Sequence, residues 1–250
     1  GLLSIGLKAG DRVAIIGDND PEWLFADFAT KAAGGIVVGL FTDAIPSELE
    51  YIIGHSDSKI VFAKDQEQSD KMLSIKDKVG IERIIYWDPK GMLKYDDPCL
   101  MSLSQVLGLG KKYEAEHAGL FEELIERGKE EDVCLLCYTS GTKALPKGAL
   151  LSSSPCFRAV RNVFKFYPWQ DNYQAISYMP LAWMGGQGLD LPGWLLSGCT
   201  INFPEEPETV FIDCREIGAN VGERHPRQWD YFSSEVLAKI TDADVFKRVT

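Results

Sequence analysis

One segment of the chain carries the residue types needed to hold a polyphosphate. It runs from Tyr138 to Gly148 with the sequence YTSGTKALPKG. Closely spaced backbone N–H groups, hydroxyls and lysines together can form an anion-binding concavity. The same composition also makes an ordinary exposed turn, so the context of the segment must decide between the two. The candidate phosphate ligands are Thr139, Ser140, Gly141, Thr142, Lys143, Lys147 and Gly148.

The residues around this segment predict the elements that present it. An apolar run, Val133 to Cys137, favours a strand before the loop, and Ala149 to Leu151 favours a short strand after it. Farther upstream, strand-like apolar runs alternate with helical patterns, which is the signature of a parallel sheet covered by helices. The sequence therefore predicts an α/β fold with mostly parallel strands flanked by helices. The predicted strands are 12–16, 36–41, 59–63 and 83–87, and the predicted helices begin at Pro21, Pro46 and Gln66.

Some local expectations are more specific. Asp20 is expected to cap the first helix, and Trp23, Phe25, Phe28 and Ala32 have a spacing suited to burial. We expect 88–110 to be irregular and 114–131 to form one amphipathic, acidic helix. Beyond the loop we expect helices over 155–166, 191–196, up to about 217 and after Pro226, and strands over 174–179 and 199–203.

Composition excludes several classes of protein. The net charge of the 250 residues is 26 − 37 = −11, which argues against a nucleic-acid-binding surface. Six cysteines in a chain of this length indicate free thiols. Cys134 and Cys137 form a CxxC, but no second CxxC or His pair completes a zinc set, so core packing is favoured over metal binding. We see no signal peptide or membrane-spanning run and expect a cytoplasmic protein.

The loop resembles the phosphate-binding loop of the adenylate-forming enzymes, whose pattern is Tyr-Thr-Ser-Gly-Thr-Thr-Gly-x-Pro-Lys-Gly. This chain departs from the pattern at Lys143 and Ala144. ISYMPLAW (Ile176 to Trp183) is similar to a second family segment. GLKAGDRVAIIGDNDPEW near the start, and FPEEPETVFIDCREIG with PRQWD near the end, resemble the long-chain fatty acid–CoA ligase branch.

The resemblance implies ATP-dependent activation of a long-chain fatty acid through an acyl-adenylate, followed by transfer to coenzyme A. It implies that the loop holds the ATP phosphates and that Trp183 and Gly185 lie near the acyl group, although the residue type alone favours a core tryptophan at a strand end for Trp183. Arg227 could meet an anion or pair with Asp230. The expected partners are ATP, a fatty acid and coenzyme A, without nucleic acid, and peripheral membrane association of the full-length protein is a further implication.

The family's Tyr-Gly-x-Thr-Glu and Thr-Gly-Asp blocks do not occur in these 250 residues. We therefore expect residues 1–250 to be the N-terminal portion of an adenylation domain, lacking its later part, the small C-terminal domain and the Mg²⁺ ligands, and to be inactive alone. Two alternatives stay open. One is a degenerate, non-catalytic nucleotide-binding or interaction module, which Lys143, Ala144 and Ser153 favour. The other is an adenylation enzyme for a different carboxylic acid.

Overall fold

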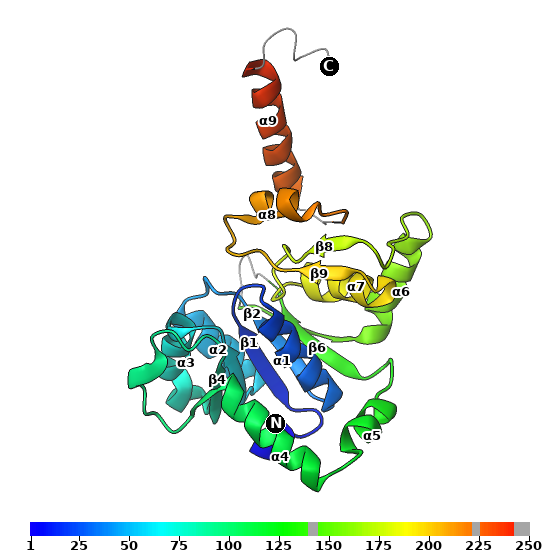
Figure 1. The fold of residues 1–250 in the computed structure, drawn as a ribbon. Helices are drawn as coiled ribbons and strands as arrows, with labels where there is room; N and C mark the ends of the chain where they lie inside the picture. Colours follow the sequence, from blue (N-terminus) through cyan, green and yellow to red (C-terminus); the bar gives the residue numbers. More distant parts are fainter. Residues whose placement is uncertain (140–144, 222–225, 243–250) are drawn as a thin grey trace.

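The computed structural model describes residues 1–139, 145–221 and 226–242, and for 226–228 it describes the backbone alone. In this part of the chain the main element is a seven-stranded sheet with the order β5-β4-β3-β1-β2-β6-β7 (Figure 1). Neighbouring strands are parallel except for β6 and β7. The strands are β1 (Arg12–Ile16), β2 (Ile36–Leu40), β3 (Ile60–Ala63), β4 (Arg83–Tyr86), β5 (Leu100–Ser102), β6 (Val133–Tyr138) and β7 (Gly148–Ser152). The predicted fold class is confirmed.

Helices cover both faces of this sheet, because its central strands are apolar on both faces. On one face α1 packs with Trp23 and Leu24 against Val13 and Ile15. On the other face Leu49 of α2 and Met72 of α3 join a second core with Ala14 and Ile16. The helices of this part are α1 (Pro21–Ala32), α2 (Pro46–Ser56), α3 (Gln66–Val79), α4 (Leu103–Glu116) and α5 (Leu120–Arg127), with 3-10 turns η1 (Leu3–Ile5) and η2 (Met92–Lys94).

The second half of the chain packs beside the carboxyl ends of the central strands (Figure 1). It holds a two-stranded parallel sheet, and α9 projects from the body at the top of the view. Its elements are α6 (Ser153–Phe164), β8 (Gln174–Ile176), the π-helical turn η3 (Gly186–Asp190), α7 (Leu191–Ser197), β9 (Thr200–Asn202), α8 (Val210–Ile217) and α9 (Pro226–Asp242).

Two expectations about the middle of the chain are wrong. The segment 88–110 is not wholly irregular, since it contains β5 and most of α4. Ser102 and Gln105 cap the start of α4 reciprocally. Gln105 N donates to Ser102 Oγ at 3.2 Å, and Ser102 N donates to Gln105 Oε1 at 2.7 Å. The single helix expected over 114–131 is instead the end of α4 and a separate α5. Gly119 divides them, because its φ of 80° lies in the left-handed region that favours glycine.

The first helix also differs from its prediction. Trp23 is fully buried, but Phe25 and Phe28 are 59% and 37% exposed. Asp20 occupies the N-cap position without a side-chain cap hydrogen bond. Its carboxylate instead accepts a hydrogen bond from Trp87 Nε1 at 3.0 Å and pairs with Lys64 Nζ at 3.1 Å. Tertiary partners therefore replace the local cap.

Candidate functional site

The predicted phosphate loop is closed at its base by the sheet. Strand β6 ends at Tyr138, which pairs with Gly148 at the start of the antiparallel strand β7. One residue farther, the backbone N–H of Thr139 donates to the carbonyl of Lys147 at 3.0 Å. The two ends of the loop are thus fixed side by side, at the carboxyl end of a strand that lies next to β2 in the sheet.

Helix α2 supports the base of this loop. The hydroxyl of Tyr51 donates to the carbonyl of Pro146 at 2.9 Å, and His55 Nδ1 lies 2.7 Å from the hydroxyl of Tyr138. Burial raises the pKa of Tyr138, so its hydroxyl stays protonated at neutral pH. Sequence reasoning missed Tyr51 and His55. The helix predicted from Pro46 ended at Ile53 and so excluded His55, whereas α2 continues to Ser56 and its four-residue spacing places Tyr51 and His55 on one face.

The described ligand candidates have the exposure that a phosphate site needs. Thr139 and Lys147 are exposed, and Lys147 forms no ion pair with the residues that the structure describes. Gly148 packs closely against β6, since a Cβ there would lie 2.7 Å from Cδ1 of Leu136. Ser140, Gly141, Thr142 and Lys143, like Ala144 and the side chain of Arg227, lie outside the described residues.

The two predicted acyl-site residues, Trp183 and Gly185, lie against each other. A Cβ on Gly185 would approach the Trp183 ring to 2.5 Å, so the glycine leaves room for the indole. Trp183 is 38% exposed, which does not fit a fully buried core tryptophan. The backbone then turns directly into helix, with Gln187 N donating to the carbonyl of Trp183 at 3.1 Å.

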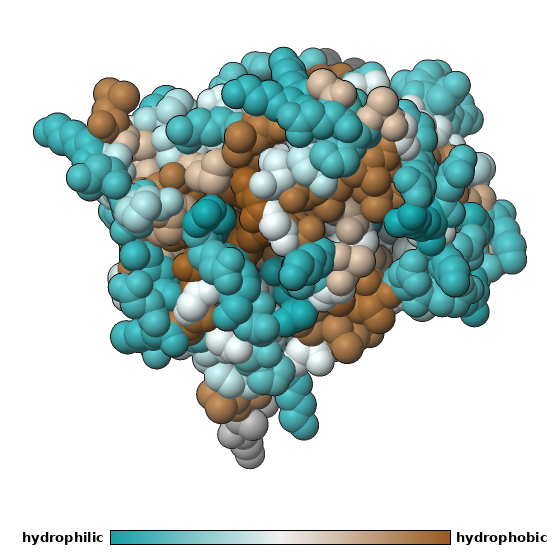
Figure 2. Space-filling view, turned by 90° about the horizontal axis from the view of Figure 1, so that it is seen from below, coloured by the Kyte–Doolittle hydropathy of each residue, from teal (hydrophilic) through white to brown (hydrophobic). Residues whose placement is uncertain are grey.

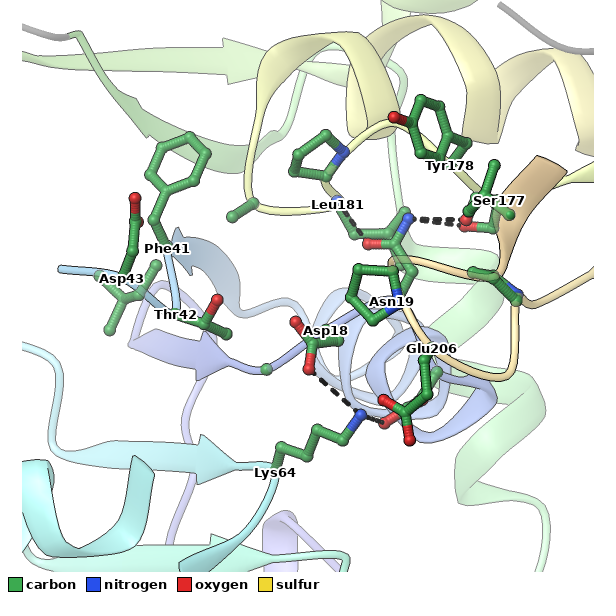
Figure 3. Close-up of a pocket in the computed structure, with 18 of the residues that line it drawn as sticks. Asp18, Asn19, Phe41, Thr42, Asp43, Lys64, Ser177, Tyr178, Leu181 and Glu206 are labelled. Atoms are coloured by element: carbon green, nitrogen blue, oxygen red, sulfur yellow. Dashed lines mark hydrogen bonds and ion pairs between the residues drawn. The ribbon is translucent and has the colours of Figure 1, made fainter. Parts of the chain in front are cut away.

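A cleft of about 370 Å³ lies where the two sheets meet (Figure 3). It opens at the carboxyl ends of β1 and β3, whose following connections run in opposite directions, and such switch points are where open α/β sheets bind ligands. Its one lysine, Lys64, pairs with Asp18 and Asp20 at 3.3 and 3.1 Å. Burial, which lowers the pKa of Lys64, is outweighed by the two carboxylates, so that pKa is raised.

A larger cavity of about 800 Å³ lies between α1, α6 and α7. The size of this cavity falls within the range of small-molecule sites, roughly 300–1,000 Å³. Apolar side chains that line it are Phe28, Ile36, Phe157, Leu191 and Leu195.

Figure 2 views the molecule from the side on which α4 and α5 lie in Figure 1. It shows apolar residues gathered in the middle of that face with hydrophilic residues around them.

The CxxC cysteines belong to the packing of this region. Cys134 and Cys137 are free thiols, half-buried, and pack against the core on the α1 face. Burial raises the pKa of Cys137 to about 11. A thiol held protonated in this way is a poor nucleophile and a poor metal ligand at neutral pH.

Among the described residues, His, Cys, Asp and Glu side chains form no group of three or more that could hold a metal ion. Among the described helices, none has both the length and the apolar character that crossing a bilayer requires.

Residues 1–245 match the family model described as AMP-binding enzyme. The long-chain-fatty-acid–CoA ligase ACSBG1 of Rattus norvegicus is 28% identical over 259 residues, covering 99% of this chain and 35% of that protein. ACSBG2 of Xenopus laevis is 27% identical, covering 99% and 34%. This chain therefore spans about a third of the length of these relatives.

Solved structures share the fold at lower identity. The anthranilate CoA ligase AuaEII in complex with anthranoyl-AMP has a TM-score of 0.63 at 20% identity, covering 82% of this chain and 37% of that one. ATP-bound MatB from Rhodopseudomonas palustris has a TM-score of 0.63 at 22% identity, covering 86% and 39%. The Thr-Ser-Gly-Thr loop on the β6–β7 frame and the family match over 245 residues agree, and the chain belongs to the AMP-binding enzyme family.

Proposed function

We propose that this chain is the N-terminal portion of a long-chain fatty acid–CoA ligase that forms an acyl-adenylate. In the first step a fatty acid carboxylate oxygen attacks the α-phosphorus of ATP and pyrophosphate leaves. In the second step the thiol of coenzyme A attacks the acyl carbonyl and AMP leaves. Long-chain acids are the substrates named for the relatives that cover 99% of this chain.

The observation that carries the proposal is the closed base of the β6–β7 loop. The Tyr138–Gly148 pair and the Thr139–Lys147 hydrogen bond of 3.0 Å fix both ends of the phosphate-loop sequence. Nucleotidyl transfer depends on positioning and charge neutralisation more than on covalent work by side chains. We assign phosphate contacts to Thr139, Ser140, Gly141, Thr142 and Gly148, and charge neutralisation to Lys147 with Lys143.

The cavity of about 800 Å³, which residues from both halves of the chain line, supports an acyl site. Its wall is formed partly by α7, which follows Trp183 and Gly185 within ten residues. The apolar part of its lining buries the alkyl chain of an acid, while charged side chains, among them Lys31 and Asp132, line it as well, and the carboxylate has to reach the loop. Such burial contributes roughly 0.8 kcal/mol per methylene, which favours long acids over short ones.

The remaining partners follow from the reaction. ATP and coenzyme A are co-substrates, and Mg²⁺ would neutralise the polyphosphate through ligands other than the described residues. The six free thiols support a reducing compartment, and we place the protein in the cytoplasm, with peripheral membrane association of the full-length protein as a further proposal.

The test is fatty-acid-dependent exchange between ATP and radioactive pyrophosphate, on the full-length protein if the gene continues beyond Thr250. Exchange with palmitate but not with benzoate or an amino acid supports the proposal. Exchange with an aromatic or amino acid instead would identify an adenylation enzyme for another acid.

A non-catalytic nucleotide-binding module is the second candidate, favoured by Lys143 and Ala144 in the loop. The double substitution Lys143→Thr with Ala144→Gly separates the two. If the loop is degenerate, restoring the family residues raises ATP affinity in calorimetry and leaves exchange absent. If the loop is a working variant, the unsubstituted protein already supports exchange.

A further inference from the structure

One side chain of the first half of the molecule holds the backbone of the second half in place. Asn19 follows β1, and its Nδ2 donates to the carbonyls of Ser177 and Met179 at 3.0 and 2.8 Å (Figure 3). Nδ2 also lies 3.0 Å from the Ser177 hydroxyl, and Oδ1 accepts from Leu181 N at 3.0 Å. A single amide thus bonds to three residues about 160 positions away in the sequence.

Ala182, which follows Leu181, lies directly against the main sheet. A Cβ on Gly39 of β2 would lie 2.7 Å from Cα and 2.9 Å from the carbonyl oxygen of Ala182. Only glycine permits this approach, because the opposing atoms belong to the backbone. β2 lies next to β6 in the sheet. Ala182 is therefore held against the strand adjacent to the one that ends in the phosphate loop.

The segment that contains Ala182 leads into one wall of the acyl cavity. Trp183 follows at once, and Gly185 leads into η3 and α7 without an intervening loop. Leu191 and Leu195 of α7 line the cavity. Asn19 itself is not among the residues that line it. Asn19 therefore acts on an acid in the cavity indirectly, through the segment 177–183 that its amide holds or through α1, which begins two residues later and also lines the cavity.

We propose that Asn19 is a positioning residue for acyl binding, which it serves by fixing the segment 177–183 between β1 and β2. This role rests on the proposed acyl site. The amide is the group required, since its N–H donors face carbonyl oxygens and its oxygen faces an N–H. A carboxylate of the same shape would keep the acceptor, lose both donors and place a negative charge against two carbonyls.

The test compares Asn19→Ala and Asn19→Asp with the original 250-residue chain. The control is Asn220→Ala, which removes a side-chain acceptor of Gln174 N at 2.9 Å, at the other end of β8. Palmitate and octanoate affinities are measured by calorimetry, and amide hydrogen exchange is followed over 178–188 and over β1 to β4. Urea midpoints show whether each variant is folded.

We expect both Asn19 variants to weaken palmitate binding by at least about ten-fold, the effect of one or two net hydrogen bonds. Amide exchange over 178–188 should accelerate by a similar factor, with β1 to β4 and Asn220→Ala unchanged. A role in packing alone would spare the isosteric Asn19→Asp. Gly39→Ala displaces the same segment without removing a side chain that bonds to it. If neither Asn19 variant folds, this variant should show the same loss of palmitate affinity.

The outcomes separate this role from the proposed function. If the original chain binds no palmitate, the acyl site itself is wrong. If the original chain binds palmitate and the folded Asn19 variants bind it equally well, the acyl site stands and the positioning role is refuted. Unchanged exchange over 178–188 in those variants would also refute it.

Discussion

Replacing Gly39 by alanine adds one methyl group at a place where the structure has no room for it. The new Cβ would lie 2.7, 2.9 and 3.1 Å from Cα, O and C of Ala182, where ordinary contact begins at 3.4 Å. The Ala182 backbone would have to retreat by about 0.7 Å, the difference between 3.4 and 2.7 Å. It cannot do so freely, because Asn19 holds Leu181 N at 3.0 Å.

The expected cost follows from these contacts. Overpacking of this kind destabilises by about 1–3 kcal/mol. Alanine also restricts the unfolded chain, which stabilises by about 0.4–1 kcal/mol. We therefore expect Gly39→Ala to lower the free energy of unfolding by about 1–2 kcal/mol, a shift of roughly 0.5 M in the urea midpoint for an m-value of about 3 kcal/mol/M.

The matched control is Gly108→Ala. Gly108 lies inside α4, and a Cβ there would meet no atom within 4 Å. The same chemical change should stabilise by about 1 kcal/mol, because alanine is the better helix former. Opposite shifts of the two urea midpoints support the reasoning. A neutral or stabilising Gly39→Ala would show that the segment 177–183 yields easily and is not held against β2.

Two further predictions concern buried polar side chains. Gln187 is 3% exposed, and neither the nitrogen nor the oxygen of its side-chain amide has a hydrogen-bond partner among the described residues. Gln187→Met should therefore leave the urea midpoint unchanged or raise it. A loss of about 2 kcal/mol or more in the free energy of unfolding would instead reveal a partner for the amide. Asp27 is fully buried, and burial raises its pKa although Lys31 Nζ lies 2.7 Å away and opposes the shift. The folded state therefore binds the Asp27 proton more tightly than the unfolded state does. As the pH rises from about 3.9, the unfolded value, to the higher folded pKa, the unsubstituted chain should lose stability relative to the Asp27→Asn variant. Urea unfolding of both chains between pH 4 and 7 measures this, and a difference that is constant or has the opposite sign would refute it.

Local sequence signals predicted most of the main sheet, because its strands are short apolar runs between turn residues. The β1 run Arg12–Ile16 and the loop-delivering run that became β6 were located to within a residue. Failures occurred where tertiary contacts override local preference. Asp20 has the residue type and position of a cap, yet Lys64 and Trp87 use its carboxylate. Phe25 and Phe28 have helical spacing, yet they lie on the side of α1 turned away from the sheet core.

The candidate site shows the same division. The loop residues were identifiable because anion binding needs a particular run of hydroxyls, glycines and lysines, and such a run stands in the sequence itself. The partners of its supporting residues were not identifiable, because Tyr51 donates to the carbonyl of Pro146 and His55 contacts the hydroxyl of Tyr138, both more than 80 positions along the chain. Asn19 likewise bonds to backbone atoms about 160 positions away, and no residue type at 177–181 indicates this. The shortness of β8 illustrates this. An apolar run predicts a strand over 174–179, but the strand ends at Ile176, and the carbonyls of Ser177 and Met179 bond to Asn19. Asn19 is thus the partner of these two carbonyls shortly before Trp183, so the departure from the local prediction occurs next to the proposed acyl site.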